Sequence, residues 1–180
     1  MMEDLSLHIL DIAENAIAAG ASRITILINE NEARNALSIR IRDNGSGMSR
    51  KVSGRALDPF FTTKGKRTGL GLPLLAQAAE QCGGRMTLSS APGSGTTVAA
   101  FFRFRHIDRP PLTNMAGTLS VLVFGHPSIA FFYRHRRGGR TFRFASPRLR
   151  VRGGILTPAP GRAARLRAEI ERGLRGIGRT

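Results

Sequence analysis

Hydrophobic residues near the N-terminus recur every three or four positions, which is the period of an amphipathic helix. The pattern runs from Leu5 to Ile17, and Gly20 follows it as a helix stop. We therefore expect the first helix here. Asp11 and Asn15 are four residues apart within it. Side chains at that spacing emerge on the same face of a helix, so these two polar groups should act together.

The next apolar positions follow the period of a β-strand. Residues 22–28 are rich in β-branched side chains, 29–35 form a polar segment that predicts a turn, and 36–42 alternate strictly between apolar and polar. Continuing that alternation places Asp43 on the inward face of the second strand. A carboxylate buried without a partner is costly. The pattern thus indicates a buried acceptor that awaits a hydrogen-bond donor.

Glycines follow this acidic residue and return further along the chain. Gly45 and Gly47 allow the backbone to turn sharply and to approach a ligand. Residues 48–68 show little periodicity and several basic side chains, which predicts a long, mobile, basic loop. Gly69 and Gly71 then precede an apolar helix expected over 72–82. A glycine turn that leads into a helix N-terminus presents free N–H groups and the positive end of the helix dipole, which favour phosphate.

Two further strands are expected after this helix, over 85–90 and 96–104, and a Pro-Gly-Ser-Gly turn joins them. On the second of these strands Thr96 shares its parity with the apolar residues. Its hydroxyl is therefore expected to face inward.

The pattern changes after residue 106, and we divide the chain there into residues 1–106 and a small basic accessory region, 107–180. In the second region we expect a linker over 108–111, a helix over 112–124, a hairpin over 129–144 turned at Gly138 and Gly139, and a basic helix over 158–176. No catalytic constellation is visible in this region. The fold class predicted for the whole chain is α/β with a small C-terminal α/β appendage.

Composition adds constraints on location and partners. The formal net charge is +16, and the accessory region holds 15 arginines but only three acidic residues. Such a surface attracts an acidic protein partner, or alternatively nucleic acid. The N-terminus lacks a basic signal-peptide region, no apolar run is long enough to span a membrane, and the single cysteine, Cys82, excludes an internal disulfide. A cytoplasmic protein is expected.

Four segments carry a resemblance to a known family. They are DIAENAIAAGA (11–21), DNGSGM (43–48), DPFFTTK (58–64) and TGLGL (68–72). In this order they resemble the motifs of the GHKL ATPase superfamily, which includes gyrase B, heat-shock chaperone ATPases, histidine kinases and MutL-type proteins. The resemblance implies a Bergerat-type ATP-binding fold, a mostly antiparallel mixed sheet with helices on one face, and ATP and Mg²⁺ as cofactors.

The resemblance also implies roles for individual residues. Asn15 matches the asparagine that coordinates Mg²⁺, and Asp11 occupies the place of the catalytic glutamate, although it is one methylene shorter. Asp43 matches the aspartate that accepts a hydrogen bond from the adenine 6-amino group, and Thr96 the threonine that supports it. Lys64 could reach the phosphates. The remaining predicted nucleotide-binding residues lie in the glycine motifs: Gly45, Gly47, Thr68, Gly69, Leu70 and Gly71.

Three functions fit these features. The first is an ATP-binding protein of histidine-kinase type with slow intrinsic ATP hydrolysis, which phosphorylates or regulates a separate partner in signal transduction. The second is a serine kinase of the anti-sigma type. The third is a non-catalytic nucleotide sensor whose basic tail binds a partner or nucleic acid.

Overall fold

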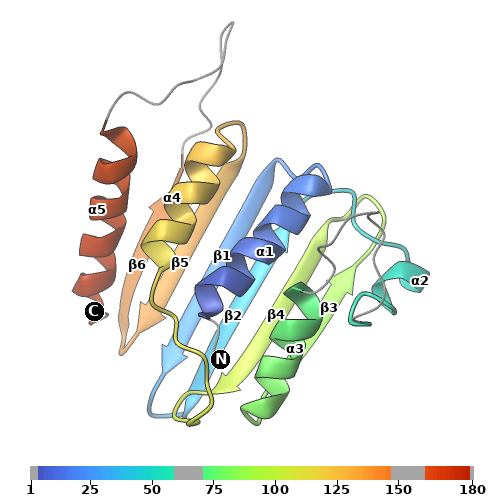
Figure 1. Cartoon of the computed structure of the whole chain (residues 1–180), viewed down its shortest axis with the longest axis horizontal. Helices are drawn as coiled ribbons and strands as arrows, with labels where there is room; N and C mark the ends of the chain where they lie inside the picture. The colour runs from blue at the N-terminus through green and yellow to red at the C-terminus, as the bar shows by residue number, and fades with distance from the viewer. Residues whose placement is uncertain (1–3, 59–70, 147–160, 179–180) are drawn as a thin grey trace, which may run out of the picture.

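One mixed sheet forms the centre of the molecule. The computed structural model describes residues 4–58, 71–146 and 161–178 (Figure 1). The sheet has the strand order β3-β4-β2-β1-β5-β6. All neighbouring strands are antiparallel except β1 and β5, which are parallel. The strands are β1 (Arg23–Asn31), β2 (Ala36–Asp43), β3 (Arg85–Ser90), β4 (Thr96–Arg103), β5 (Ala130–Arg137) and β6 (Arg140–Ala145).

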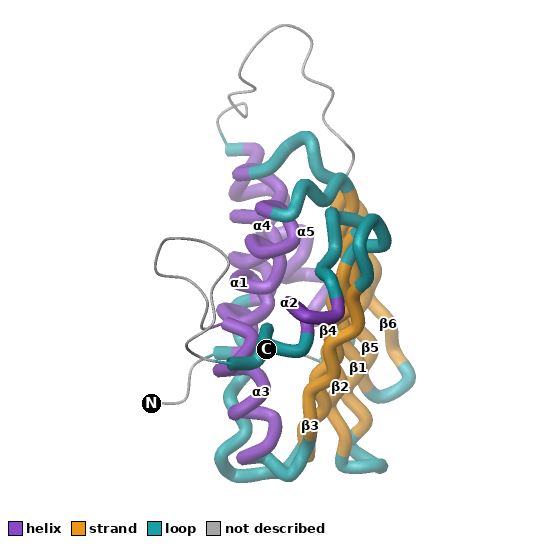
Figure 2. Tube along the Cα trace, turned by 90° about the vertical axis from the view of Figure 1, so that its right-hand side faces the viewer, coloured by secondary structure: helices purple, strands orange, loops and turns teal. Residues whose placement is uncertain are grey.

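Helices cover only one face of this sheet (Figure 2). The helices are α1 (Leu5–Ala18), the one-turn α2 (Arg50–Ser53), α3 (Gly71–Gln81), α4 (Met115–Gly125) and α5 (Arg162–Gly176). The opposite face carries no helix in the part of the chain that the structure describes. The predicted fold class, a mostly antiparallel mixed sheet with helices on one face, is confirmed.

Helix α1 begins and ends where local chemistry requires. Asp4 is its N-cap and accepts a hydrogen bond from the Ser6 amide at 2.7 Å. At the other end Gly20 adopts φ +76°, and the Ala21 amide donates to the carbonyl of Ala16 at 3.0 Å. This C-terminal motif brings the chain back toward the sheet and starts β1.

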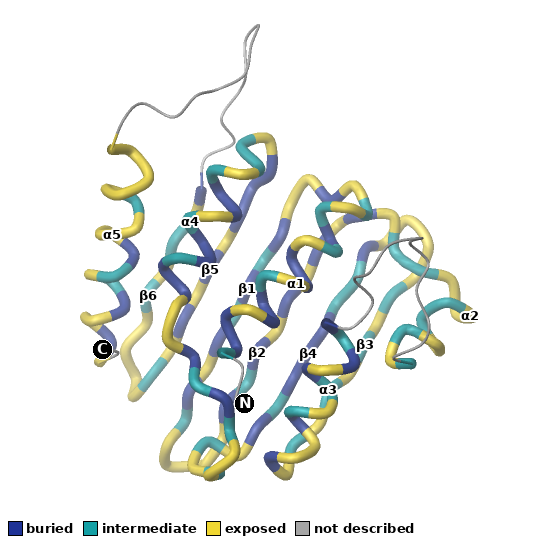
Figure 3. The backbone as a smooth tube through the Cα atoms, in the orientation of Figure 1, coloured by how far each residue is buried: buried dark blue, intermediate teal, exposed yellow. Residues whose placement is uncertain are grey.

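The core lies between the sheet and the helices (Figure 3). Alternate strand residues point into this core. On β2 the buried positions are those that the sequence predicts, namely Leu37, Ile39, Ile41 and Asp43. The helices contribute apolar stripes, including Leu5 and Ile9 of α1. The same core cluster extends to α4 and α5, with Leu119, Leu122, Ile170 and Leu174.

Strand β1 is longer than its sequence pattern predicts. The sequence predicts a turn over 29–35, but β1 continues to Asn31, so the prediction is wrong for residues 29–31. Glu30 is only 3% exposed, since it continues the inward parity of the strand and meets His135 of β5. The turn itself comes later, and Asn35 within it has φ +49°. A long-range partner therefore changes what the polar sequence indicates locally.

The loop predicted over 48–68 is also not irregular throughout. Helix α2 forms within it, and the side chain of Ser49 accepts from the Val52 amide at 3.4 Å as a weak N-cap. Residues 59–68 of the loop lie outside the described residues. The predicted mobility of the loop stays a prediction.

The basic region after residue 106 contains the predicted elements, a helix, a hairpin and a terminal helix. Its hairpin joins the sheet, because β5 pairs in parallel with β1 over eight positions from Arg23–Ala130 to Glu30–Arg137. Both regions thus share one sheet and one core. The division into residues 1–106 and 107–180 stays a prediction about sequence organisation.

Candidate functional site

The carboxylate of Asp43 is held in a fixed orientation at the end of β2. Its Oδ1 accepts from the Gly45 amide at 2.8 Å and from the Thr96 amide at 3.2 Å. The residue is 8% exposed. Both of these amides, which belong to the described residues, bind Oδ1, so Oδ2 retains acceptor capacity for a ligand. This is the geometry expected of a buried acceptor that recognises an amino group.

The glycine loop after Asp43 packs against the end of α1. The Ser46 amide donates to the carbonyl of Ala19 at 2.8 Å. A Cβ on Gly45 would lie 2.8 Å from that same carbonyl oxygen. Gly47 has φ +66°, and a Cβ there would lie 2.0 Å from the carbonyl oxygen of Ala91. These positions admit only glycine, because the loop is clamped between α1 and the β3–β4 turn.

Thr96 contacts the carboxylate through its backbone, and its predicted role in nucleotide binding stays a prediction. Its backbone amide contacts Asp43, whereas its hydroxyl lies 3.0 Å from the Ser90 hydroxyl. Thr96 is half-buried. Its hydroxyl belongs to a small polar cluster with the Ser90 hydroxyl and the Gly95 carbonyl, to which Ser90 donates at 3.0 Å.

Asp11 and Asn15 lie on α1, exposed and half-buried respectively. A Cβ on Gly71 would lie 3.0 Å from the Cβ of Asp11 and 3.3 Å from its Oδ2. The Asp11 side chain therefore lies directly against the first residue of α3, where the positive end of the helix dipole favours a carboxylate. Asn15 lies one turn before Ala19, and the Ala19 amide donates to the Asn15 carbonyl at 3.0 Å. The loop after Asp43 binds the carbonyl of the same Ala19.

The structure thus joins Asp43, Gly45, Gly47 and Thr96 to one another near the C-terminal end of α1, where Asn15 also lies. It places Asp11, further back on α1, against Gly71 of α3. Lys64, Thr68, Gly69 and Leu70 lie outside the described residues, as do Phe60 and Phe61. Their predicted roles stay predictions.

Sequence reasoning missed Asn44. Its side-chain oxygen accepts from the amides of Ser22 and Arg23 at 3.0 and 2.8 Å, and its amino group donates to the Ser22 hydroxyl at 3.0 Å. The Asx turns that asparagine favours were the available signal. Asn44 ties the start of β1 to the end of β2 and so fixes where Asp43 lies.

A family model connects this geometry to known proteins. Residues 3–106 match the family described as histidine kinase-, DNA gyrase B- and HSP90-like ATPases. The chain belongs to this family. The match includes α1, the loop after Asp43 and β4, and its end coincides with the change in sequence pattern at residue 106.

Curated relatives include sensor histidine kinases. The chain is 33% identical over 89 residues to sensor histidine kinase ZraS of Escherichia coli, covering 49% of this chain and 19% of that protein. It is 37% identical over 92 residues to AtoS of E. coli and 37% over 91 residues to NtrY of Azorhizobium caulinodans, covering 15% and 12% of those proteins. The chain therefore spans less than a fifth of the length of these relatives. At this level the similarity identifies an ATP-binding domain of histidine-kinase type.

A solved structure extends the likeness in fold. The crystal structure of the N-terminal domain of a DNA repair protein superposes with a TM-score of 0.58 at 14% identity, over 81% of this chain and 53% of that one. Because residues 1–106 make up less of the chain than this, the superposition includes part of the region after residue 106. Part of that region therefore also has a counterpart in this fold.

Two other features are absent from the described residues. These residues contain no group of three or more His, Cys, Asp or Glu side chains suited to a metal ion. Within the same residues, none of the helices is both long and apolar enough to span a bilayer. Any metal at this site would rely on few protein ligands together with phosphate oxygens, which is the usual arrangement for Mg²⁺.

Proposed function

We propose that this chain binds Mg-ATP at the site around Asp43 and transfers phosphate to, or regulates, a separate partner protein in signal transduction. The observation that carries the proposal is the fixed Asp43 carboxylate. Two backbone amides bind its Oδ1, which leaves Oδ2 to accept a hydrogen bond from a ligand. Its support is the family match and the histidine-kinase relatives.

The carboxylate selects adenine by hydrogen-bond polarity. The 6-amino group of adenine donates to Oδ2, whereas guanine carries an acceptor at that position. A buried acceptor facing another acceptor loses its hydrogen bond at a cost of about 1–3 kcal/mol. The expected preference for ATP over GTP is therefore on the order of tenfold to a hundredfold.

The phosphates and the metal belong at the other end of this site. The side-chain oxygen of Asn15 supplies a hard ligand for Mg²⁺, and the N-terminus of α3 at Gly71 offers N–H groups to the phosphates. Mg²⁺ would neutralise phosphate charge when bound. Residues 64 and 68–70 would complete this end.

Slow intrinsic hydrolysis is expected. Asp11 lies against Gly71 at the start of α3, and it is shorter than the glutamate that serves as general base in hydrolytic relatives. A base must come within hydrogen-bonding distance of the attacking water or act through a second water. Asp11 is better placed to position the start of α3 than to activate water.

A separate phosphoacceptor fits the burial of the histidines. His8 is 4% exposed and His135 is fully buried, so neither ring offers an accessible acceptor nitrogen. His106 and His126 each face a carboxylate of Asp108 or Glu14, at 3.8 and 3.1 Å. Phosphorylation of the chain itself would therefore have to use the partly exposed His106 or His126, whereas a separate acceptor predicts no stable label on the chain after incubation with labelled ATP.

The test is calorimetric titration of ATP, ADP and GTP into the wild type and Asp43→Asn. The asparagine keeps an oxygen for the Gly45 and Thr96 amides and turns an N–H₂ toward the base. We expect ADP affinity to fall roughly tenfold to a hundredfold and the ATP-to-GTP preference to shrink.

Asp108→Asn makes the same chemical change on an exposed carboxylate in another loop, and its ADP affinity should equal that of the wild type. Unchanged ADP affinity in the Asp43→Asn variant would overturn the adenine assignment. Turnover of several ATP molecules per second by the chain alone would instead show that Asp11 is a competent base.

A further inference from the structure

The face of the sheet opposite the helices is strongly basic. Eight arginines occupy outward positions on its strands: Arg23, Arg40, Arg42, Arg85, Arg103, Arg134, Arg136 and Arg143. No outward strand position on this face holds an acidic residue. We call this surface the open face.

Within the described residues, the arginines of the open face have no acidic partners. None of the eight forms an ion pair with a carboxylate of the described residues. The described acidic side chains lie on helices, in turns, at the cap of α1 or at inward strand positions such as Glu30 and Asp43. Like charges on neighbouring strands destabilise a sheet. The absence of acidic side chains from the outward positions of the described strands therefore points to a polyanionic ligand.

Strand register gathers arginines that are distant in the sequence. Arg40 pairs with Leu27, Leu27 pairs with Arg134, and Arg134 pairs with Arg143. These cross-strand neighbours form a row across four strands, in which adjacent strands lie about 4.8 Å apart. Half of the row comes from each side of the 106/107 boundary. The parallel β1–β5 pairing is thus what creates the surface.

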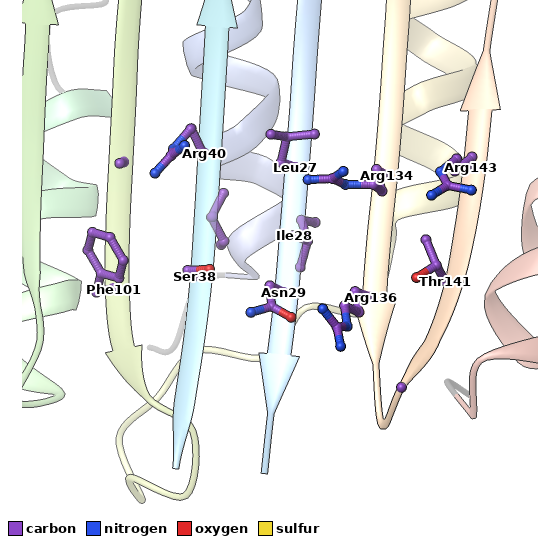
Figure 4. A pocket seen from close by; sticks show the side chains of 13 residues that line it. Leu27, Ile28, Asn29, Ser38, Arg40, Phe101, Arg134, Arg136, Thr141 and Arg143 are labelled. Atoms are coloured by element: carbon purple, nitrogen blue, oxygen red, sulfur yellow. The ribbon is translucent and has the colours of Figure 1, made fainter. Parts of the chain in front are cut away.

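A hollow lies along this row (Figure 4). Its volume is about 380 Å³, and its lining includes Leu27, Asn29, Ser38, Phe101, Arg134 and Thr141. In the close-up, the guanidinium groups of Arg134 and Arg136 extend toward β1 over this floor. The hollow therefore combines cations and short hydrogen-bonding side chains with a smaller apolar surface at Leu27 and Phe101.

Aromatic rings lie among the arginines. Phe132 is 40% exposed, and the guanidinium carbon of Arg23 lies 6.0 Å from its ring centroid. Phe101 is half-buried, with the guanidinium carbon of Arg85 at 5.2 Å. Along the sequence these aromatics are separate from the arginines they contact, so only the fold reveals that the two are interleaved.

We propose that the open face binds single-stranded nucleic acid. Arginines would neutralise the phosphates, and exposed bases would stack on Phe132, Phe101 and the guanidinium planes, which is how sheet surfaces bind single strands. An acidic peptide would use the arginines but has no need of the rings. The proposal does not depend on the nucleotide site, which lies on the helix-covered side of the sheet.

The experiment is fluorescence anisotropy with labelled single-stranded RNA and DNA of about 12 nucleotides, a length that one sheet surface can contact. The matched duplex and a polyglutamate peptide serve as competitors, and excess Mg-ADP is added in a separate titration. We expect both single strands to bind, the duplex and polyglutamate to compete at least tenfold more weakly, and Mg-ADP not to compete.

Two triple variants remove the same charge from different surfaces. R40Q/R134Q/R143Q alters the open face, and R162Q/R165Q/R172Q alters exposed positions of α5 on the other side of the sheet. The open-face variant should lose at least tenfold in affinity, and the slope of log K against log salt should fall by about 2. The α5 variant should change affinity less than threefold.

A single variant tests stacking separately from charge. Phe132→Leu keeps an apolar side chain but removes the ring, and a fivefold or greater loss of affinity is expected. Circular dichroism and thermal unfolding check that every variant is folded. Three results would overturn the proposal: equal losses in both triple variants, displacement of the single strand by Mg-ADP, or polyglutamate binding as tightly as the oligonucleotides, which would assign the face to an acidic protein.

Discussion

Glu30 of β1 and His135 of β5 form a buried hydrogen-bonded pair, with 2.6 Å between Oε1 and Nε2. The side chains are 2% and 0% exposed. On its other side, Nδ1 of His135 lies 2.7 Å from the Tyr133 hydroxyl. This pair joins the region matched by the family model to the region that follows it.

His135→Ala should strongly destabilise the fold. The substitution removes the imidazole from the buried Glu30 side chain, which keeps Arg137 at 3.7 Å, and loss of one hydrogen-bond partner of a buried group costs about 1–3 kcal/mol. Urea unfolding followed by circular dichroism measures the change in free energy of unfolding.

His135→Gln keeps a donor and should lose less stability than His135→Ala. His106→Ala, on a half-buried ring beside an exposed aspartate, should change stability by less than about 1 kcal/mol. An unaltered urea midpoint for His135→Ala would contradict the role assigned to the pair.

Gly47→Ala should impair both stability and nucleotide binding. Gly47 and Gly93 have nearly the same positive φ, +66° and +73°, but only at Gly47 would a Cβ meet another atom, 2.0 Å from the Ala91 carbonyl oxygen. Gly93→Ala therefore measures the backbone strain alone, about 1–2 kcal/mol. Gly47→Ala adds a clash with backbone and should cost about 2 kcal/mol more.

Calorimetry with ADP tests the consequence for the site. The loop that contains Gly47 also carries the Gly45 amide bound to Asp43, so displacing it should weaken ADP binding in Gly47→Ala and spare it in Gly93→Ala. Equal behaviour of the two variants would show that the close approach to Ala91 is unimportant.

Asp4 should make stability depend on acid pH. Burial alone would raise the pKa of its carboxyl group, but hydrogen bonds from Ser6 and Thr113 to the ionised form lower that pKa below the usual 3.8. A group whose folded pKa is lowered contributes stability above its unfolded pKa and loses it as pH falls through the folded value. The difference in unfolding free energy between wild type and Asp4→Asn should therefore be constant above about pH 5 and shrink below about pH 4.

Urea titrations at pH 7, 4 and 3 provide the measurement, and Asp108→Asn corrects for the general loss of one acid. Because the Thr113 amide donates to Asp4 at 3.0 Å, the effect also reports the attachment of α1 to the segment before α4. A stability difference that does not change down to pH 3 would contradict the lowered pKa.

Removing residues 108–180 should prevent independent folding. The truncation would expose the backbone of β1, which forms a parallel pair with β5 over eight positions, and would uncover the core beside Leu119 and Leu122. Exposed strand edges and apolar patches promote aggregation. Size-exclusion chromatography and amide hydrogen exchange would reveal the loss. A soluble, protected fragment that binds ADP with wild-type affinity would instead establish that residues 1–106 form an independent domain.

The sequence predicts local features well because they depend on local periodicity. The alternation from Leu37 to Ile41 is enough to orient Asp43 inward, and Gly20 is enough to end α1. Long-range pairing is not encoded in this way. Nothing near Glu30 indicates that His135 will cover it, so the strand was predicted too short. The open face was missed for the same reason, because its arginines meet only after β5 pairs with β1.

The parallel junction also affects how the chain folds during synthesis. Glu30 and His135 are separated by 105 residues, so the ribosome must add that length before β1 acquires its second neighbour. At about 5–20 residues per second, the nascent β1 edge waits roughly 5–20 s. During this interval the emerging chain presents an unpaired strand to chaperones and to other nascent chains. Translation speed over residues 31–137 therefore sets how long this vulnerable intermediate persists.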